Sequence, residues 1–145
     1  LNRSRFYRRM TPFAIAQIYK MTRQSCPLHR DEMSLAMTTN LPPERIRELA
    51  PHWSSRSEEY PVHPLNFFTQ LALASRIPLR KNPPSASLLL LNSGKDRVVH
   101  PQCSLDIANA WGLPLHTHPE AGHDLTLNDP QWVVDKLKSW EFLGK

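Results

Sequence analysis

The last third of the chain most constrains the fold, because strand and helix signals alternate along it. A run of leucines at 88–91 has no polar alternation, which is typical of a strand covered on both faces. Apolar residues at helical spacing then predict a helix over 100–112 that ends at a glycine cap. A second short strand is expected over 113–119, and a last helix over 130–143 that opens with Asn-Asp-Pro. This order predicts an α/β fold with parallel strands joined by a right-handed crossover.

The first eighty residues predict several short helices separated by prolines and polar joints. Helices are expected over 12–24, 31–39 and 43–49 and from a cap at Asn66, with a loop over 51–64. A proline-rich linker over 80–87 follows them, so we divide the chain into a helical segment, 1–79, and an α/β part, 80–145. Most of the large apolar residues of the helical segment are expected in the core: Phe13, Tyr19, Met33, Met37, Trp53, Phe67 and Phe68.

Length and composition bound the class of protein. The chain has 145 residues, 40% of them apolar, which is enough for one compact core. No stretch approaches the roughly 20 apolar residues of a membrane span, and the opening LNRSRFYRRM lacks the apolar core of a signal peptide. Cys26 and Cys103 lie far apart and match no paired-thiol spacing. We therefore expect a soluble, cytoplasmic protein with no membrane partner, and the leading leucine in place of methionine is typical of a piece of something longer.

The charge balance is basic, with a net charge of +5 and a cluster of arginines at the start: Arg3, Arg5, Arg8 and Arg9. Few aromatic residues interleave and no helix-turn-helix or zinc-finger pattern follows, so we expect no nucleic-acid partner. A non-catalytic interaction module, whose basic arm binds an acidic partner, is the alternative to an enzyme. With only four glycines the chain has no glycine-rich phosphate loop, and we expect no cofactor.

Two loops follow the two predicted strands, SGKDRVV and PEAGHDL, and they carry Asp96 and His123. Loops at the carboxyl ends of parallel strands lie at the same edge of a sheet, where working residues of α/β folds gather. Asp96 can therefore approach His123 although a helix and a strand separate them. A carboxylate beside an imidazole fixes its tautomer, orients the ring and stabilises the imidazolium that forms when the histidine takes a proton.

Residues next to this pair have ordinary structural explanations. Gly94 is expected to permit the tight turn before Asp96, and Gly122 a close approach of backbone or substrate to His123. Asp124 directly follows His123, but adjacent residues of a loop usually point apart. We therefore expect Asp124 to anchor the loop by hydrogen bonds.

A metal site is a second interpretation of the same region. His116 and His118 are two apart on a predicted strand, so they face one side and would chelate zinc together with His123 or Asp124. The run is also similar to the H-x-H-x-D-H signature of metallo-β-lactamase-like hydrolases, except that the aspartate here follows the third histidine. We expect no metal, and we interpret His116 and His118 as ordinary polar residues near the end of a strand.

The motif LLLLNSGKDRVV, followed by AGHDLTLNDPQWVVDKLKSW, resembles the C-terminal part of an α/β-hydrolase. In that family an acid after a late strand and a histidine after the last strand complete a Ser-acid-His triad. The resemblance implies the late part of a hydrolase sheet, with two to three parallel strands, flanking helices and a helical lid over 1–79. It implies Asp96 as the acid, His123 as general base and then general acid, and a small-molecule acyl substrate such as an ester or thioester.

The resemblance lacks one central part, because the Gly-x-Ser-x-Gly nucleophile elbow is absent from the chain. The early strands and the oxyanion-hole loop are missing as well. We expect the N-terminal half of the hydrolase core to exist in the parent protein as the partner of this part, and the chain alone to be inactive. Ser93 and Ser104 flank the acid loop without an elbow around either, and Cys103 is expected to be buried in a helix and inert. An aspartate nucleophile or lyase chemistry would use the same histidine.

Overall fold

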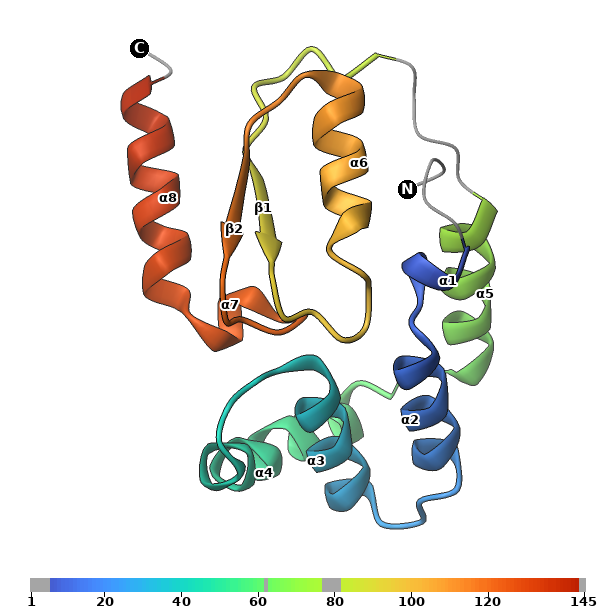
Figure 1. Cartoon of the computed structure of the whole chain (residues 1–145). Helices are drawn as coiled ribbons and strands as arrows, with labels where there is room; N and C mark the ends of the chain where they lie inside the picture. The colour runs from blue at the N-terminus through green and yellow to red at the C-terminus, as the bar shows by residue number, and fades with distance from the viewer. Residues whose placement is uncertain (1–5, 62, 77–81, 144–145) are drawn as a thin grey trace.

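The computed structural model describes residues 6–61, 63–76 and 82–143, and it combines helices with a small parallel sheet (Figure 1). The helices of the first part are α1 (Phe6–Arg9), α2 (Pro12–Thr22), α3 (Pro27–Thr38), α4 (Pro43–Glu59) and α5 (Pro64–Arg76), called here the helical group. The second part contains β1 (Leu90–Ser93), α6 (Gln102–Trp111), β2 (Leu115–His118), α7 (Leu125–Asn128) and α8 (Pro130–Leu143). At this coarse level the expected α/β character is confirmed.

The two strands pair in parallel, as the alternation of elements predicted. Leu90 lies opposite Leu115, and Ser93 lies opposite His118. Helix α6 connects the strands, and Figure 1 shows α6 and α8 on opposite sides of them. Within the described residues the sheet has two strands. The first strand begins later than the predicted 88, because residue 114 opposite its extension is a proline and has no N–H to add to the ladder.

The strands are only partly covered. Leu90 and Leu91 are half-buried, although the leucine run predicted a strand covered on both faces. Ser93, at the end of the strand, is 4% exposed. The prediction of full coverage is therefore wrong for the start of β1, because the described part of the chain provides one flanking helix on each side and no third strand.

Helix α2 begins where the sequence predicts, since the hydroxyl of Thr11 accepts a hydrogen bond from the N–H of Ala14 at 3.2 Å. Gly112 also caps α6 as predicted, in the left-handed conformation with φ of 65°. The last helix, α8, runs over the predicted residues, and the carboxylate of Asp129 accepts from the N–H of Trp132 at 2.9 Å. These three helix ends could be predicted because the capping contacts join residues that are close in sequence.

The predicted loop over 51–64 is wrong for its first part, because α4 continues through Pro51 to Glu59. Proline removes one helical hydrogen bond, but Ala50 and Ser54 on either side of it are buried, and α4 packs closely against α3. Tertiary packing therefore outweighs the local helix-breaking signal. Two other helices begin earlier than expected, each at a proline that favours the first helical position: α3 at Pro27 and α5 at Pro64.

One buried cluster joins the helical group to the loop after β1. It contains Ala14 of α2, Met37 of α3 and Val98 of the loop. Partly buried residues pack around the cluster: Met10, Ile18, Met21 and Val99. The N–H of Thr11 also donates to the carbonyl of Val98 at 2.9 Å. The helical group thus packs directly against the segment that carries Asp96.

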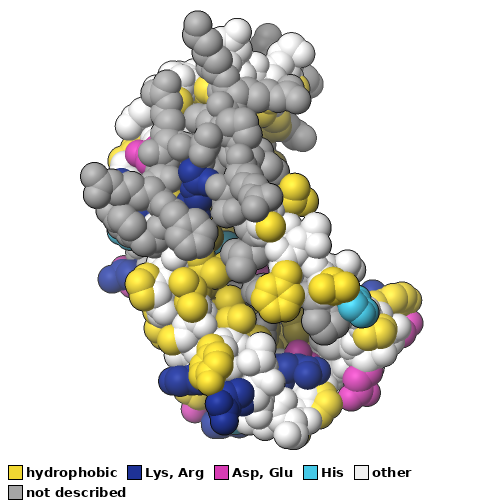
Figure 2. Space-filling model, turned by 90° about the vertical axis from the view of Figure 1, so that its right-hand side faces the viewer, with side chains coloured by type: hydrophobic (Ala, Val, Ile, Leu, Met, Phe, Trp, Pro, Cys, Tyr) yellow, Lys and Arg dark blue, Asp and Glu magenta, His cyan; other side chains and the backbone are white. Residues whose placement is uncertain are grey.

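The rest of the helical group exposes much apolar surface, and apolar side chains gather on the face seen in Figure 2. Several residues predicted in the core are exposed instead: Phe13, Tyr19, Trp53 and Phe68. Met37 is buried as predicted and Met33 half-buried, while the side chain of Phe67 lies outside the described part. Ala14 and Ala50 are buried, together with Leu35 and Met37, while the four large side chains named above stay exposed.

Candidate active site

The loops after β1 and β2 are hydrogen-bonded to each other at one edge of the sheet. The N–H of Gly94 donates to the carbonyl of His118 at 2.7 Å, and the N–H of Lys95 donates to the carbonyl of Ala121 at 3.1 Å. A Cβ at Gly94 would lie 3.0 Å from the carbonyl oxygens of His118 and Pro119. The expected turn is present, since the N–H of Asp96 donates to the carbonyl of Ser93 at 3.4 Å, but Gly94 does not have a positive φ, and the close approach of the second loop is what favours glycine there.

Asp96 and His123 meet at this edge, as the strand order predicted. The Nδ1 atom of His123 lies 2.9 Å from Oδ2 of Asp96. The other carboxylate oxygen, Oδ1, accepts from the N–H groups of Val98 at 2.8 Å and Val99 at 2.9 Å. Asp96 is mostly buried, with 11% of its side chain exposed. Both oxygens are therefore engaged, and the carboxylate is fixed in an orientation that faces the imidazole.

This contact determines the chemistry available to His123. Because Nδ1 faces a carboxylate, it carries the proton, and Nε2 is the nitrogen left to accept one. The hydrogen bond to Asp96 raises the pKa of His123 above its ordinary value of 6.5, burial lowers it, and the negative charges of Asp96 and Asp124 raise it further. The net direction is upward. With 42% of its side chain exposed, His123 is an accessible base whose protonated form is stabilised.

The end of α3 lies directly against the loop that carries His123. A Cβ at Gly122 would lie 2.9 Å from the carbonyl oxygen of Thr38 and 3.1 Å from two backbone atoms of Thr39. The N–H of Asp124 donates to the same carbonyl of Thr38 at 2.8 Å. The expected close approach at Gly122 is confirmed, and the approaching backbone belongs to the helical group.

Asp124 anchors the loop, as expected. Its carboxylate caps α7, accepting from the hydroxyl of Thr126 at 2.9 Å and the N–H of Leu127 at 3.3 Å. The carboxylate that contacts His123 belongs to Asp96 and not to this neighbour. The two carboxylates near the histidine thus have different tasks.

Two side chains that the sequence did not single out attach the helical group to the site. The guanidinium of Arg97 donates to the carbonyls of Ala36 at 2.8 Å and Thr39 at 3.0 Å, at the C-terminal end of α3. The amide of Asn40 donates to the carbonyl of Glu120 at 2.9 Å. The only sequence signal for Arg97 is its position beside Asp96, because its partners are backbone atoms distant in sequence.

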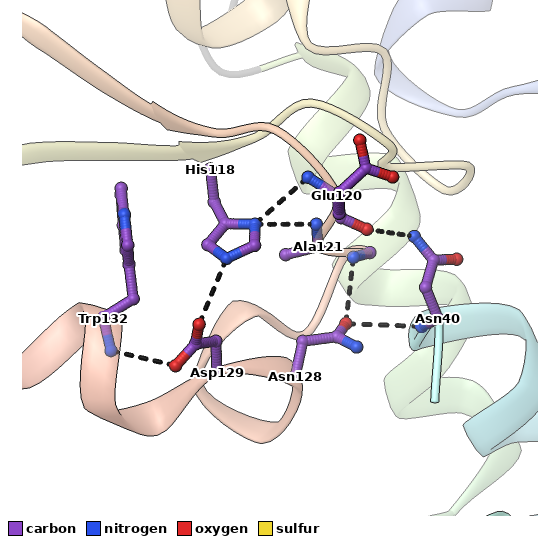
Figure 3. A network of polar contacts seen from close by, with 8 residues as sticks. Asn40, His118, Glu120, Ala121, Asn128, Asp129 and Trp132 are labelled. Carbon is purple, nitrogen blue, oxygen red and sulfur yellow. Dashed lines mark hydrogen bonds and ion pairs between the residues drawn. The ribbon is translucent and has the colours of Figure 1, made fainter. Parts of the chain in front are cut away.

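His118 forms several contacts with the loop after β2 and with the start of α8. Its Nδ1 lies 2.9 Å from the N–H nitrogen of Ala121 and 3.2 Å from that of Glu120, and its Nε2 lies 3.3 Å from Oδ2 of Asp129 (Figure 3). Its ring also meets the ring of Trp132 edge to face, with centroids 5.2 Å apart. His118 ends β2, as the sequence interpretation expected, but the backbone donors that bend back from the following loop could not be read from the sequence.

The other candidate residues lie within the two strands and α6. Across the part of the chain that the structure describes, no three His, Cys, Asp or Glu side chains are grouped to hold a metal ion. His116 is half-buried on β2. Ser93 ends β1 and is buried, while Ser104 lies in the first turn of α6. Cys103, with 2% exposed, is buried in α6 as predicted.

The basic N-terminal run is described in part. Arg3 and Arg5 lie outside the described residues, while Arg8 and Arg9 form the end of α1. The carbonyl of Arg8 accepts from the N–H of His100 at 2.8 Å, so this part of the run is attached to the segment before α6. Within the described residues, no helix has the length and apolarity needed to cross a membrane.

Comparisons of the chain with protein-family models, curated proteins and solved structures found no match.

Proposed function

We propose that Asp96 and His123 are the acid and base of an α/β-hydrolase of the serine-hydrolase type, acting on an ester, thioester or related acyl bond. The observation that carries the proposal is the 2.9 Å contact between Nδ1 of His123 and Oδ2 of Asp96. The two residues follow adjacent parallel strands in the order acid, then histidine, with one helix between those strands. This is the order in which the α/β-hydrolases arrange the two residues.

In this mechanism Nε2 of His123 takes the proton of a serine hydroxyl as the hydroxyl oxygen attacks the acyl carbon. Asp96 stabilises the imidazolium that forms and keeps the ring oriented. The imidazolium then gives its proton to the leaving group, and a water molecule repeats the cycle to release the acid. The two backbone N–H groups on Oδ1 of Asp96 hold the carboxylate in the orientation that this task requires.

The serine and the oxyanion-hole amides are proposed to come from polypeptide other than these 145 residues, since the sequence contains no Gly-x-Ser-x-Gly motif. Two features support a larger sheet. Two strands alone leave backbone N–H and C=O groups along their outer edges, and the leucines of β1 are only half-buried. Further parallel strands beside them would pair those groups and cover those leucines.

The helical group is proposed to act as the lid over the acyl substrate. Support comes from the contact of Thr38 and Thr39 with the backbone beside His123, which leaves the end of α3 at the border of the reacting centre. The helical group also exposes apolar side chains, as an acyl-binding surface requires.

Labelling with an alkyl fluorophosphonate probe tests the proposal on the polypeptide that contains these residues together with an elbow serine. We expect His123→Ala to lower the labelling rate by about 10²- to 10⁴-fold, because general-base catalysis contributes that much. His116→Ala, which removes a histidine of β2, is the matched control and should label like the wild type. Equal labelling of wild type and His123→Ala would remove His123 from the mechanism.

A further inference from the structure

The contacts at the two ring nitrogens of His118 select one tautomer of the ring. Two backbone N–H groups, of Glu120 and Ala121, point at Nδ1, so this nitrogen must offer a lone pair and carry no proton. The proton of the neutral ring is therefore on Nε2, where it faces the carboxylate of Asp129 at 3.3 Å. With 14% of its side chain exposed, the ring has little access to water as an alternative partner.

The partner carboxylate is itself fixed. Oδ1 of Asp129 accepts from the N–H of Trp132 at 2.9 Å and caps α8, while Oδ2 faces His118. The N–H of Trp132 lowers the pKa of Asp129, burial raises it, and the contact with His118 lowers it. The net direction is downward, so Asp129 is an ionised acceptor. The edge of the His118 ring lies against the Trp132 ring, which completes its surroundings.

Ala121 connects His118 to the catalytic pair. Its N–H donates to Nδ1 of His118, and its carbonyl accepts from the N–H of Lys95, the residue before Asp96. Ala121 is 2% exposed, so neither bond is easily replaced by water. The next N–H, of Gly122, donates to the side-chain oxygen of Asn128 at 2.9 Å. The short segment between His118 and His123 is thus fixed by side-chain acceptors at the N–H groups of Ala121 and Gly122.

We propose that His118 is a positioning residue for His123. The Nε2-protonated ring holds the loop by its Nδ1 acceptor, and the loop in turn holds Nδ1 of His123 at hydrogen-bonding distance from Asp96. The acceptor at Nδ1 is the essential feature, and the bond from Nε2 to Asp129 serves to select the tautomer. The catalytic consequence rests on the proposed function, whereas the tautomer and its effect on His123 do not.

Two substitutions separate the two sides of the ring. In His118→Asn the side-chain oxygen lies near the former Nδ1 and can accept from the loop, but the side chain is too short to reach Asp129. In His118→Gln the amide nitrogen reaches toward Asp129, and no acceptor remains near the loop. We expect the asparagine variant to keep the raised pKa of His123 in an NMR titration. We expect the glutamine variant to lose that elevation and to exchange the Ala121 amide proton at least tenfold faster.

A measurement on the unaltered chain guards against variants that do not fold. Long-range ¹H–¹⁵N correlation spectra at pH 8 should show Nδ1 of His118 unprotonated and Nε2 protonated. The opposite tautomer, or equal losses in the asparagine and glutamine variants, would overturn the proposal. These readouts need no nucleophile, so they distinguish failure of this inference from failure of the proposed hydrolase activity. In the active polypeptide, fluorophosphonate labelling should be kept by His118→Asn and reduced by His118→Gln.

Discussion

Gly122→Ala tests whether contact with α3 holds the histidine loop in place. The new Cβ would lie 2.9 Å from the carbonyl oxygen of Thr38 and 3.1 Å from two backbone atoms of Thr39. Both neighbours are backbone, so they cannot rotate away as a side chain would. Overpacking of this kind costs about 1–3 kcal/mol, and losing the adjacent bond from the N–H of Asp124 to Thr38 adds about 1 kcal/mol. We therefore expect a loss of about 3 kcal/mol of unfolding free energy.

Gly112→Ala is the matched control for this variant. Gly112 has a φ of 65° and open space around its Cβ position, so alanine there costs about 1–2 kcal/mol of backbone strain without touching α3. Urea unfolding followed by circular dichroism measures both losses, and NMR titration of His123 measures the local effect. Only Gly122→Ala should change the pKa of His123. A Gly122→Ala variant as stable as wild type, or a His123 pKa that responds equally to both substitutions, would refute the reasoning.

Two further predictions concern buried carboxylates. Asp96→Asn should lower the pKa of His123 in an NMR titration, because the hydrogen bond to Asp96 is the largest cause that raises it. Since the folded pKa of His123 lies above 6.5, the stabilisation by protonated His123 is fully present below about pH 6.5 and is lost as the pH rises through the folded pKa. Urea unfolding at several pH values should show this decrease of the unfolding free energy with pH in wild type and a smaller decrease in Asp96→Asn. An equal pH dependence of the two proteins would contradict the prediction. Asp31→Asn should raise the unfolding free energy by about 1 kcal/mol, because Asp31 is 8% exposed and its Oδ2 has no hydrogen-bond partner. A lower urea midpoint for this variant would show that the carboxylate is compensated.

The Asp96–His123 contact could be predicted because it depends on local signals and one general rule. A leucine run and a glycine-capped helix locate the strand and the crossover, and the rule that parallel strands end at one edge brings their loops together. No contact between residues distant in sequence has to be known to bring Asp96 and His123 together. Asp124 could be predicted as an anchor because adjacent residues of a loop usually point apart, whereas the short helix α7 that it caps was not expected from the sequence.

The supporting contacts could not be predicted, since they join segments far apart in the chain. Arg97 binds carbonyls at the end of α3, and Gly94 and Gly122 are required by backbone from other segments rather than by their own conformation. Pro51 misled the prediction for a similar reason, because the packing of α4 on α3 outweighs the lost helical bond. In each case the deciding partner is set by tertiary structure, which local propensity does not encode.

The attachment of α3 to the backbone around His123 limits how the helices can move. Gly122 and Asp124, on either side of His123, both contact the carbonyl of Thr38. Arg97, beside Asp96, donates hydrogen bonds to carbonyls at the same end of α3. The end of α3 is therefore attached to both loops of the Asp96–His123 pair, and a movement of α3 away from either loop would break these contacts. If the helical group is the lid of the proposed hydrolase, we expect its hinge to lie outside α3, so that Asp96 and His123 stay in contact while the lid opens.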